Sequence, residues 1–168
     1  LRVDDAGATY PVEVDPYLSL AHGWELHAQE LVRQLGAAVA SAGDVDGDGY
    51  DDVLIGAPRS FAHGLNEGRA FLIRGGADGL DPAPAWEYGP GVSQTSFGDA
   101  VAGVGDVDGD GYDDVVIGAP TFDGGEEDEG RAYLFRGSAT GLESSPAWTA
   151  ESDQVGAYFG SSVAGAGD

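Results

Sequence analysis

Short runs of apolar residues, each closed by turn residues, recur along most of this chain. The β-branched run 53–55 is followed by Gly-Ala-Pro, and the run 115–117 is followed by the same three residues. Proline ends strand pairing because it has no N–H to donate. Glycines bound two further apolar runs, 69–74 and 131–136. The pattern predicts short β-strands rather than helices.

The whole pattern returns with a period of 62 residues, seen most simply in Trp24, Trp86 and Trp148. Residues 36–85 and 98–147 align without a gap and are identical at 31 of 50 positions. Such agreement at one period indicates tandem copies of a supersecondary unit that cannot bury its apolar face alone. We expect the tryptophans, which recur at one structural position, to pack between neighbouring units.

Each unit is predicted to hold four short strands. The first strand has an alternating pattern of small residues, the second and third strands are the apolar runs, and the fourth strand centres on a tryptophan. Strands that converge on an axis have room only for small side chains, whereas the outermost strand can carry tryptophan, which favours a β-propeller. We therefore predict an all-β fold of four-stranded antiparallel blades. The predicted first strands are Ala38–Ala42, Ala100–Val104 and Ser162–Ala166.

An acidic segment separates the first and second predicted strands of each unit. From Asp44 onward, aspartates occupy positions 1, 3, 5 and 9, and glycine occupies position 6. Alternating carboxylates with that glycine are typical of a calcium loop with oxygen ligands. Position 12 is Ile55 in a strand, so the closing glutamate of an EF-hand is lacking and position 9 must close the site. The predicted ligands are Asp44, Asp46, Asp48, the Tyr50 carbonyl and Asp52, and then Asp106, Asp108, Asp110, the Tyr112 carbonyl and Asp114.

The charge of the chain also favours a cation as partner. Thirty acidic residues against seven arginines give a net charge of −23, which disfavours nucleic acid and anionic membranes. Crowded carboxylates repel by up to about 1 kcal/mol per close pair even in water. Mg²⁺ demands strict octahedral geometry and Zn²⁺ lacks His or Cys ligands here, so we predict calcium. Two sites are complete, and a third would begin at Asp168.

The alternative for these segments is a solvated acidic turn without a metal. Asp51 and Asp113 stand at position 8 of the two loops, and we expect both to face solvent. Four arginines recur with the period, and we expect them to pair with carboxylates of neighbouring strands; they are Arg69, Arg74, Arg131 and Arg136.

Paired short motifs give a resemblance to a known family. Phe97-Gly98 and Phe159-Gly160 precede the acidic loops, with Leu35-Gly36 as a departure in the first copy, and Gly-Ala-Pro follows the loops at 56–58 and 118–120. The chain thus resembles FG-GAP repeats, the blades of integrin α-subunit propellers and of many bacterial extracellular proteins. The resemblance covers roughly residues 24–168 and implies the propeller fold and the same calcium ligands.

The repeat divides the chain into two parts. We expect residues 1–23 to form a hairpin and linker from a preceding β module, and residues 24–168 to form a propeller segment. Two full blades cannot close a ring of four to eight, so further blades from the same chain or from other copies are expected. The predicted units are 24–85, 86–147 and the partial 148–168.

Two segments do not follow the repeat. Residues 59–66 and 121–128 share no identity at equivalent positions, and both join the second strand to the third. In the resembling family these loops lie on the face opposite the calcium loops, which makes that face a candidate partner surface. Phe61 and Phe122 are the exposed side chains expected there, and plain drift of solvent-facing loops is the alternative.

No combination of residues indicates catalysis, so we expect no enzyme. The sequence has no cysteine, no serine, histidine and acid set in a nucleophile-like context, and no apolar run near the length of a membrane helix. We expect a calcium-stabilised scaffold for binding or adhesion to protein or glycan, secreted or at the cell surface. The alternatives are an accessory or lectin-like module of a secreted enzyme and a structural repeat of a surface filament.

Overall fold

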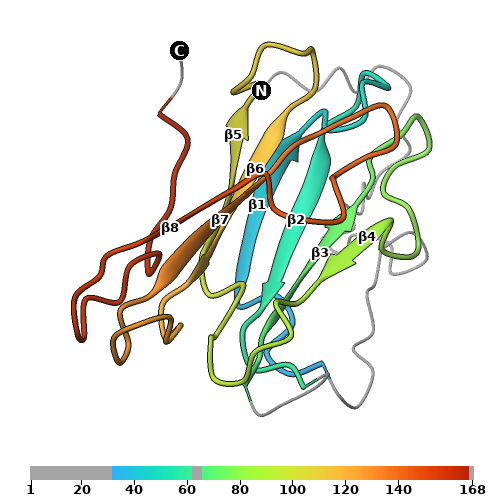
Figure 1. Cartoon of the computed structure of the whole chain (residues 1–168). Helices are drawn as coiled ribbons and strands as arrows, with labels where there is room; N and C mark the ends of the chain where they lie inside the picture. Colours follow the sequence, from blue (N-terminus) through green and yellow to red (C-terminus); the bar gives the residue numbers. More distant parts are fainter. Residues whose placement is uncertain (1–31, 62–65, 167–168) are drawn as a thin grey trace, which may run out of the picture.

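The computed structural model describes residues 32–61 and 66–166. Within these residues all regular elements are β-strands, which form two four-stranded antiparallel sheets in the orders β1-β2-β3-β4 and β5-β6-β7-β8 (Figure 1). The first sheet consists of β1 (Ala38–Gly43), β2 (Asp52–Ala57), β3 (Arg69–Ile73) and β4 (Trp86–Tyr88). The second consists of β5 (Val101–Gly105), β6 (Asp114–Ala119), β7 (Arg131–Phe135) and β8 (Trp148–Glu151).

Each sheet is a blade of the predicted kind, with sequential strands side by side. The apolar runs form β2, β3, β6 and β7, and both β2 and β6 end at the alanine before a proline. The predicted strand Ser162–Ala166 is wrong, since these residues are irregular. In the two complete units the first strand pairs with the second strand of its own unit, and residues 162–166 have no such partner among the described residues. Trp24, residues 1–23 and Asp168 lie outside the described residues.

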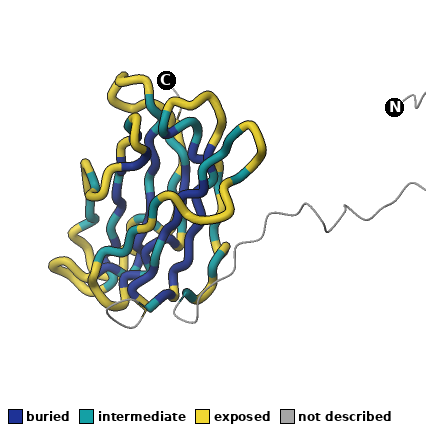
Figure 2. Tube along the Cα trace, turned by 90° about the vertical axis from the view of Figure 1, so that its right-hand side faces the viewer, coloured by how far each residue is buried: buried dark blue, intermediate teal, exposed yellow. Residues whose placement is uncertain are grey.

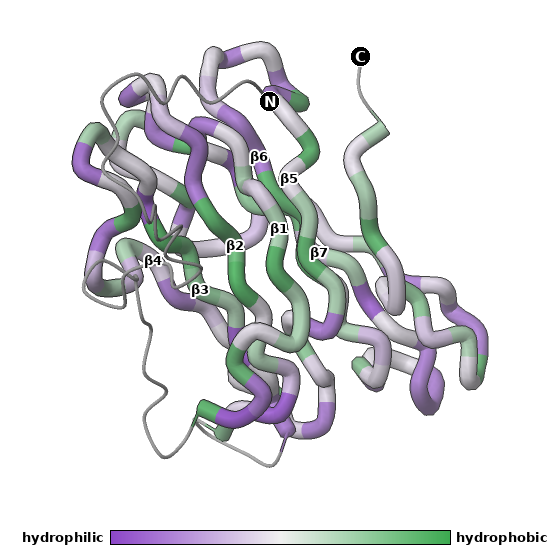
Figure 3. Tube along the Cα trace, turned by 180° about the vertical axis from the view of Figure 1, so that it is seen from behind, coloured by the Kyte–Doolittle hydropathy of each residue, from purple (hydrophilic) through white to green (hydrophobic). Residues whose placement is uncertain are grey.

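The core lies between the two sheets. Leu54 and Leu72 of the first sheet meet Ile117 and Phe135 of the second, and all four are fully buried. Figure 2 shows the buried residues along the strands and the exposed ones in the connecting loops. Figure 3 shows the same division, with hydrophobic residues on the strands and hydrophilic residues toward the ends.

The continuous apolar run of β2 is explained by burial on both faces of the first sheet. Ile55 and Ile73 point away from the second sheet and form a separate cluster with half-buried Val32, Leu35 and other residues. A strand buried on both faces has apolar residues at consecutive positions rather than alternating ones.

Tryptophan and other aromatic side chains join the sheets, as predicted for Trp86. The Trp86 ring lies 5.1 Å from Phe135, and the Tyr88 ring lies 4.8 Å from Phe135, both edge to face. Trp86 Nε1 also donates to the Glu143 carbonyl of the second unit, at 3.0 Å. Edge-to-face pairs add to the stabilisation from buried area. Trp148 holds the equivalent position in the second sheet and is 52% exposed.

The Phe-Gly and Gly-Ala-Pro motifs meet where the two units touch. A Cβ at Gly56 would overlap the Gly98 carbonyl oxygen, and a Cβ at Gly98 would overlap the Arg69 carbonyl oxygen. Gly98 also has φ +86°, which other residues rarely adopt. Its N–H donates to the Gly118 carbonyl at 2.9 Å. The motif glycines are therefore required by close backbone approach.

The antiparallel order places the connecting loops at two opposite ends. The loops 44–51 and 106–113 join first strands to second strands and lie at what we call the aspartate-loop end. Residues 58–61, 66–68 and 120–130 lie at the other end, which we call the variable-loop end. The predicted separation of the acidic loops from the variable segments is thus confirmed. No helix in the described part of the chain is long and apolar enough to cross a bilayer.

Candidate metal centre

A bulge in the strand pairing directs the chain into each acidic loop. The register of β1 with β2 shifts between Ser41 and Gly43, and that of β5 with β6 shifts between Gly103 and Gly105. Gly43 and Gly105 have φ of 77° and 75°, which glycine adopts without the steric cost that a Cβ brings. The aspartate at position 1 follows directly in both units.

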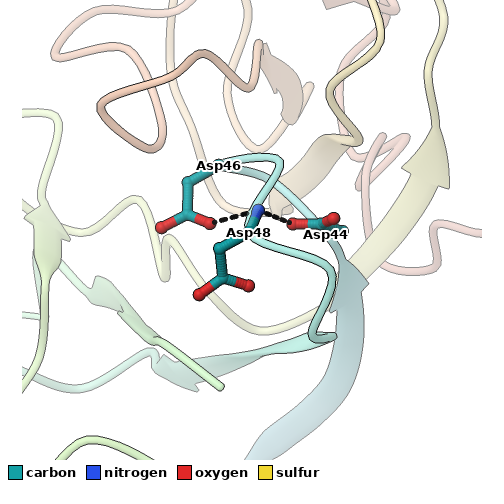
Figure 4. Close-up of side chains that lie close together, drawn as sticks. All are labelled: Asp44, Asp46 and Asp48. Atoms are coloured by element: carbon teal, nitrogen blue, oxygen red, sulfur yellow. Dashed lines mark hydrogen bonds between the residues drawn. The ribbon is translucent and has the colours of Figure 1, made fainter. Parts of the chain in front are cut away.

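Three predicted ligands gather in each loop. In the first loop Asp44, Asp46 and Asp48 each offer a carboxylate oxygen, and these oxygens lie within 4.8 Å of one another. Figure 4 shows the three side chains around the turn, with the Asp48 N–H directed at the carboxylates of the other two. The second loop repeats the group, again within 4.8 Å, with Asp106, Asp108 and Asp110.

Backbone N–H groups hold the position 1 aspartate in place. Asp44 Oδ1 accepts hydrogen bonds from Gly47 N at 2.8 Å and Asp48 N at 3.0 Å, and its Oδ2 accepts one from Gly49 N at 2.9 Å. Asp106 accepts the three equivalent bonds at 2.8, 3.0 and 2.8 Å. These hydrogen bonds wrap the backbone of each loop around its own first residue.

The position 9 aspartates lie beneath the loops at the start of β2 and β6. Asp52 is 1% exposed and accepts hydrogen bonds from Gly75 N at 2.8 Å and Val45 N at 3.2 Å. Asp114 is fully buried and accepts from Gly137 N and Val107 N. Burial raises the pKa of both carboxyl groups, against the opposing effect of these hydrogen bonds. A nearby divalent cation would favour their ionised form.

Asp52 and Asp114 are outside the two groups whose oxygens lie within 4.8 Å of one another. The N–H groups of Tyr50 and Tyr112 donate to Asp48 and Asp110 at 2.9 and 3.0 Å. The gathering of the first three aspartates is thus observed twice. The ligand roles of the position 9 aspartates and of the tyrosine carbonyls stay predictions.

Arginines from the ends of β3 and β7 reach the loops. Arg74 Nε lies 2.9 Å from Asp46 Oδ2, and Arg136 Nε lies 3.1 Å from Asp108 Oδ2. The other two recurrent arginines form the ion pairs Arg69–Glu87 and Arg131–Glu151. The predicted pairing with carboxylates of neighbouring strands is confirmed for Arg69 and Arg131, whereas Arg74 and Arg136 pair with loop aspartates. Each arginine offsets only one of the three negative charges in the clustered group of its loop.

Asp113 corrects a prediction made for position 8. Its side chain is half-buried rather than solvent-facing, and its Oδ2 accepts a hydrogen bond from Asp44 N of the first loop at 2.8 Å. The Asp113 N–H in turn donates to the Asp44 carbonyl at 3.1 Å. Asp51, the equivalent residue of the first unit, is exposed as predicted. The two loops are therefore linked side by side.

This donor set fits a hard divalent cation. Each loop supplies three clustered carboxylates at alternate positions and no nitrogen or sulfur ligand, which is the chemistry that Ca²⁺ prefers. Asp44, Asp46 and Asp48 would hold the ion in the first loop, and Asp106, Asp108 and Asp110 would hold it in the second. A bound ion would neutralise charge that the arginines leave uncompensated.

Comparison with known sequences supports the assignment of the repeat. Residues 35–73 and 97–135 match the family model for the FG-GAP repeat. These two ranges contain the Phe-Gly position, the acidic loop and the first three strands of each sheet.

Each sheet contains one FG-GAP repeat, which covers its first three strands. Integrin alpha-6 of Gallus gallus is 35% identical over 153 residues, which cover 88% of this chain and 13% of the relative. Integrin alpha-5 of Xenopus laevis is 32% identical over 90% of this chain, and integrin alpha-3 of Mus musculus is 32% identical over 98% of it. The chain spans 13 to 16% of the length of these relatives.

The opposite end of the two FG-GAP repeats carries a polar cavity. It has a volume of about 240 Å³ and lies where loops of both repeats meet. Thr121 Oγ1 donates to the Gln94 carbonyl across it at 2.7 Å. The lining residues are Asn66, Gln94, Ser96, Thr121, Asp123 and Asp128.

The two phenylalanines predicted to be exposed at this end are covered instead. Phe122 is 6% exposed because the Arg131 guanidinium lies over its ring, 3.7 Å from the centroid. Phe61 is half-buried under Arg33, at 4.7 Å. The variable-loop end is thus polar, with its two phenylalanines used in packing.

Sequence reasoning missed two buried glutamates in the FG-GAP repeats. Glu67 and Glu129 are 1% and 0% exposed and stand at equivalent positions before the third strand. Their recurrence at the 62-residue period was the available signal, as it was for the arginines.

Proposed function

We propose that this chain is part of a calcium-stabilised β-propeller that acts as a non-catalytic scaffold for extracellular binding or adhesion. The observation that carries the proposal is the group of three alternate aspartates, gathered in the same way in two successive FG-GAP repeats. The similarity to integrin alpha chains supports a protein that works outside the cell or at its surface.

Calcium would act in this scaffold as a structural component. The loops of the two repeats are hydrogen-bonded to each other through Asp44 and Asp113, so a cation in either loop also braces the junction between the blades. Ligands that bind only the folded state add their binding free energy to stability.

The partner is proposed to bind at the variable-loop end. That end differs most between the repeats and contains the polar cavity lined by residues of both. Loops held by a rigid framework are common sites of recognition. A cavity with hydroxyl, amide and carboxylate groups suits a polar partner, either a protein segment or a glycan.

The test of this proposal measures stability and binding of the whole 168-residue chain with and without calcium. Two loop sites, each at about ten times Kd, contribute about 3 kcal/mol together, which corresponds to an increase in Tm of roughly 5–10 °C. Asp48→Asn with Asp110→Asn should abolish the part of the increase that the two loop sites contribute. Asp51→Asn is the matched control and should preserve it.

The binding readout uses beads coated with the chain and a panel of immobilised extracellular-matrix proteins and glycans. We expect retention on at least one surface in calcium and loss of retention in EGTA and in the Asp48→Asn, Asp110→Asn variant. Equal Tm values in calcium and EGTA would contradict the calcium role. Stabilisation by calcium without retention on any surface would contradict the scaffold role alone.

A further inference from the structure

A third acidic group lies at the variable-loop end of the second repeat, far along the sheet from the aspartate loops. Glu129 precedes β7, Glu151 ends β8 and Asp153 follows it. Each offers a carboxylate oxygen, and these oxygens lie within 4.8 Å of one another.

Glu129 is fully buried, and only one of its two carboxylate oxygens is satisfied. Its Oε1 accepts hydrogen bonds from Gly124 N at 2.6 Å and Gly125 N at 2.7 Å. These bonds, with that from Gly125 foremost, lower the pKa of Glu129. Its Oε2 is buried without a hydrogen-bond donor. A buried anionic oxygen without a partner is costly and calls for a ligand.

The group that faces Glu129 is another carboxylate. The Glu151 carboxylate offers an oxygen within 4.8 Å of an oxygen of Glu129. Such a contact needs either a shared proton or a cation between the groups. Arg131 pairs with Glu151 on its other side and offsets one of the three negative charges.

The first repeat shows that the fold does not require these acids. Gly89 and Gly91 stand where the second repeat has Glu151 and Asp153. There the Gly91 N–H donates to the buried Glu67 at 2.8 Å, so a backbone donor meets that carboxylate. In the second repeat the side chains at these two positions place two further carboxylates beside the buried glutamate.

Gly124 leaves space beside the acidic group. A Cβ at this position would lie 2.6 Å from Glu129 Oε1 and would also overlap Glu151 Oε2 and the Phe122 ring. Any side chain at residue 124 would therefore fill the space next to the carboxylates.

We propose that Glu129, Glu151 and Asp153 bind a divalent cation of the Ca²⁺ class, at a site separate from the aspartate loops. The ligands are carboxylate oxygens alone, which suits a hard cation, and water would complete the coordination on the exposed side of Asp153. The ion would satisfy the buried oxygen of Glu129 and remove the repulsion between Glu129 and Glu151. This site belongs to the second repeat, since the first has Gly89 and Gly91 in place of Glu151 and Asp153.

The experiment counts the calcium ions bound per chain by equilibrium dialysis with radioactive Ca²⁺. Glu151→Gln with Asp153→Asn removes two charges with little change of shape and should lower the count by one. Glu126→Gln with Glu127→Gln removes two exposed charges at the same end and should leave the count unchanged. Glu151→Gly with Asp153→Gly gives the residues of the first repeat and should also lower the count by one in a folded chain.

The loop sites do not interfere with this test. The Asp48→Asn, Asp110→Asn chain should retain one ion, which the further change of Glu151 and Asp153 should remove. An unchanged count in both variants of Glu151 and Asp153 would overturn the inference and indicate a proton shared between Glu129 and Glu151. That outcome would leave the calcium sites of the loops untouched.

Discussion

Asp51 and Asp113 occupy the same place in two nearly identical loops, yet only one of them has a structural partner. Asp113 accepts the Asp44 N–H of the preceding loop, whereas Asp51 is exposed among the described residues. The difference between Asp113 and Asp51 comes from the neighbouring loop that Asp113 contacts rather than from the sequence of its own loop. A side chain in a repeat is defined by both its own unit and the unit before it.

This difference gives a prediction with an internal control. Asp113→Ala should lower the free energy of unfolding by about 1–2 kcal/mol because the Asp44 N–H loses its acceptor. Asp51→Ala should change it by less than about 0.5 kcal/mol, as is usual for an exposed site. Urea denaturation followed by tryptophan fluorescence measures both. Equal effects of the two changes would show that the bond between the loops does not stabilise the fold.

At the residue scale the sequence predicted which side chains could be metal ligands better than it predicted which side chains are exposed to solvent. Spacing alone identified the alternate aspartates, since a calcium loop is a local pattern. The covering of Phe122 by Arg131 could not be predicted, because the contact needs the chain to turn back through the loop before β7. The burial of Asp113 depends on a residue 69 positions away.

At the scale of the strands, the contact between Gly56 and Gly98 joins the second strand of one unit to the Phe-Gly turn of the next. The backbones meet so closely that neither position has room for a Cβ. The Gly-Ala-Pro segment of one repeat and the Phe-Gly segment of the next therefore form a single contact.

Gly56→Ala should destabilise the chain by about 1–3 kcal/mol because the new methyl group would overlap the Gly98 carbonyl. Gly76→Ala is the matched control, since its nearest neighbour is 3.6 Å away. That change should be neutral, or should stabilise by about 0.4–1 kcal/mol through the unfolded state. Thermal melts monitored by circular dichroism compare the two. A loss no larger for Gly56→Ala than for Gly76→Ala would contradict the close contact.

The strands themselves were largely predictable. Apolar runs that end at proline determined β2 and β6, and both strands stop where the missing N–H requires. Residues 162–166 repeat the composition of a first strand but form none, because a strand needs a hydrogen-bonded partner as well as suitable residues. Composition can be read from a short segment of sequence, whereas strand pairing depends on residues elsewhere in the chain.

For the whole molecule, the packing of one sheet on the next gives the two tryptophans different roles. Trp86 lies half-buried against Phe135 of the second sheet, while Trp148 is 52% exposed. The prediction that tryptophans pack between units is correct for Trp86. For Trp148 the described residues supply no such neighbour.

Trp86→Ala should lower the free energy of unfolding by about 2–4 kcal/mol, somewhat below the cost of removing a fully buried tryptophan. Trp148→Ala should cost less than about 1 kcal/mol in the same chain. Guanidinium denaturation followed by circular dichroism measures both values. If the two changes cost the same, the sheets do not depend on the aromatic contact between them.

The two faces of each sheet are unlike, and this has a consequence for assembly. The face of the first sheet with Leu54 and Trp86 packs against the face of the second sheet with Ile117 and Phe135. Contacts of this kind are heterologous, so every added unit repeats the same rotation and translation. A further sheet that packs on Trp148 in the same way must present the face equivalent to that of Ile117 and Phe135. Addition of sheets through this surface is therefore directional, which the symmetric contact of a twofold dimer does not allow.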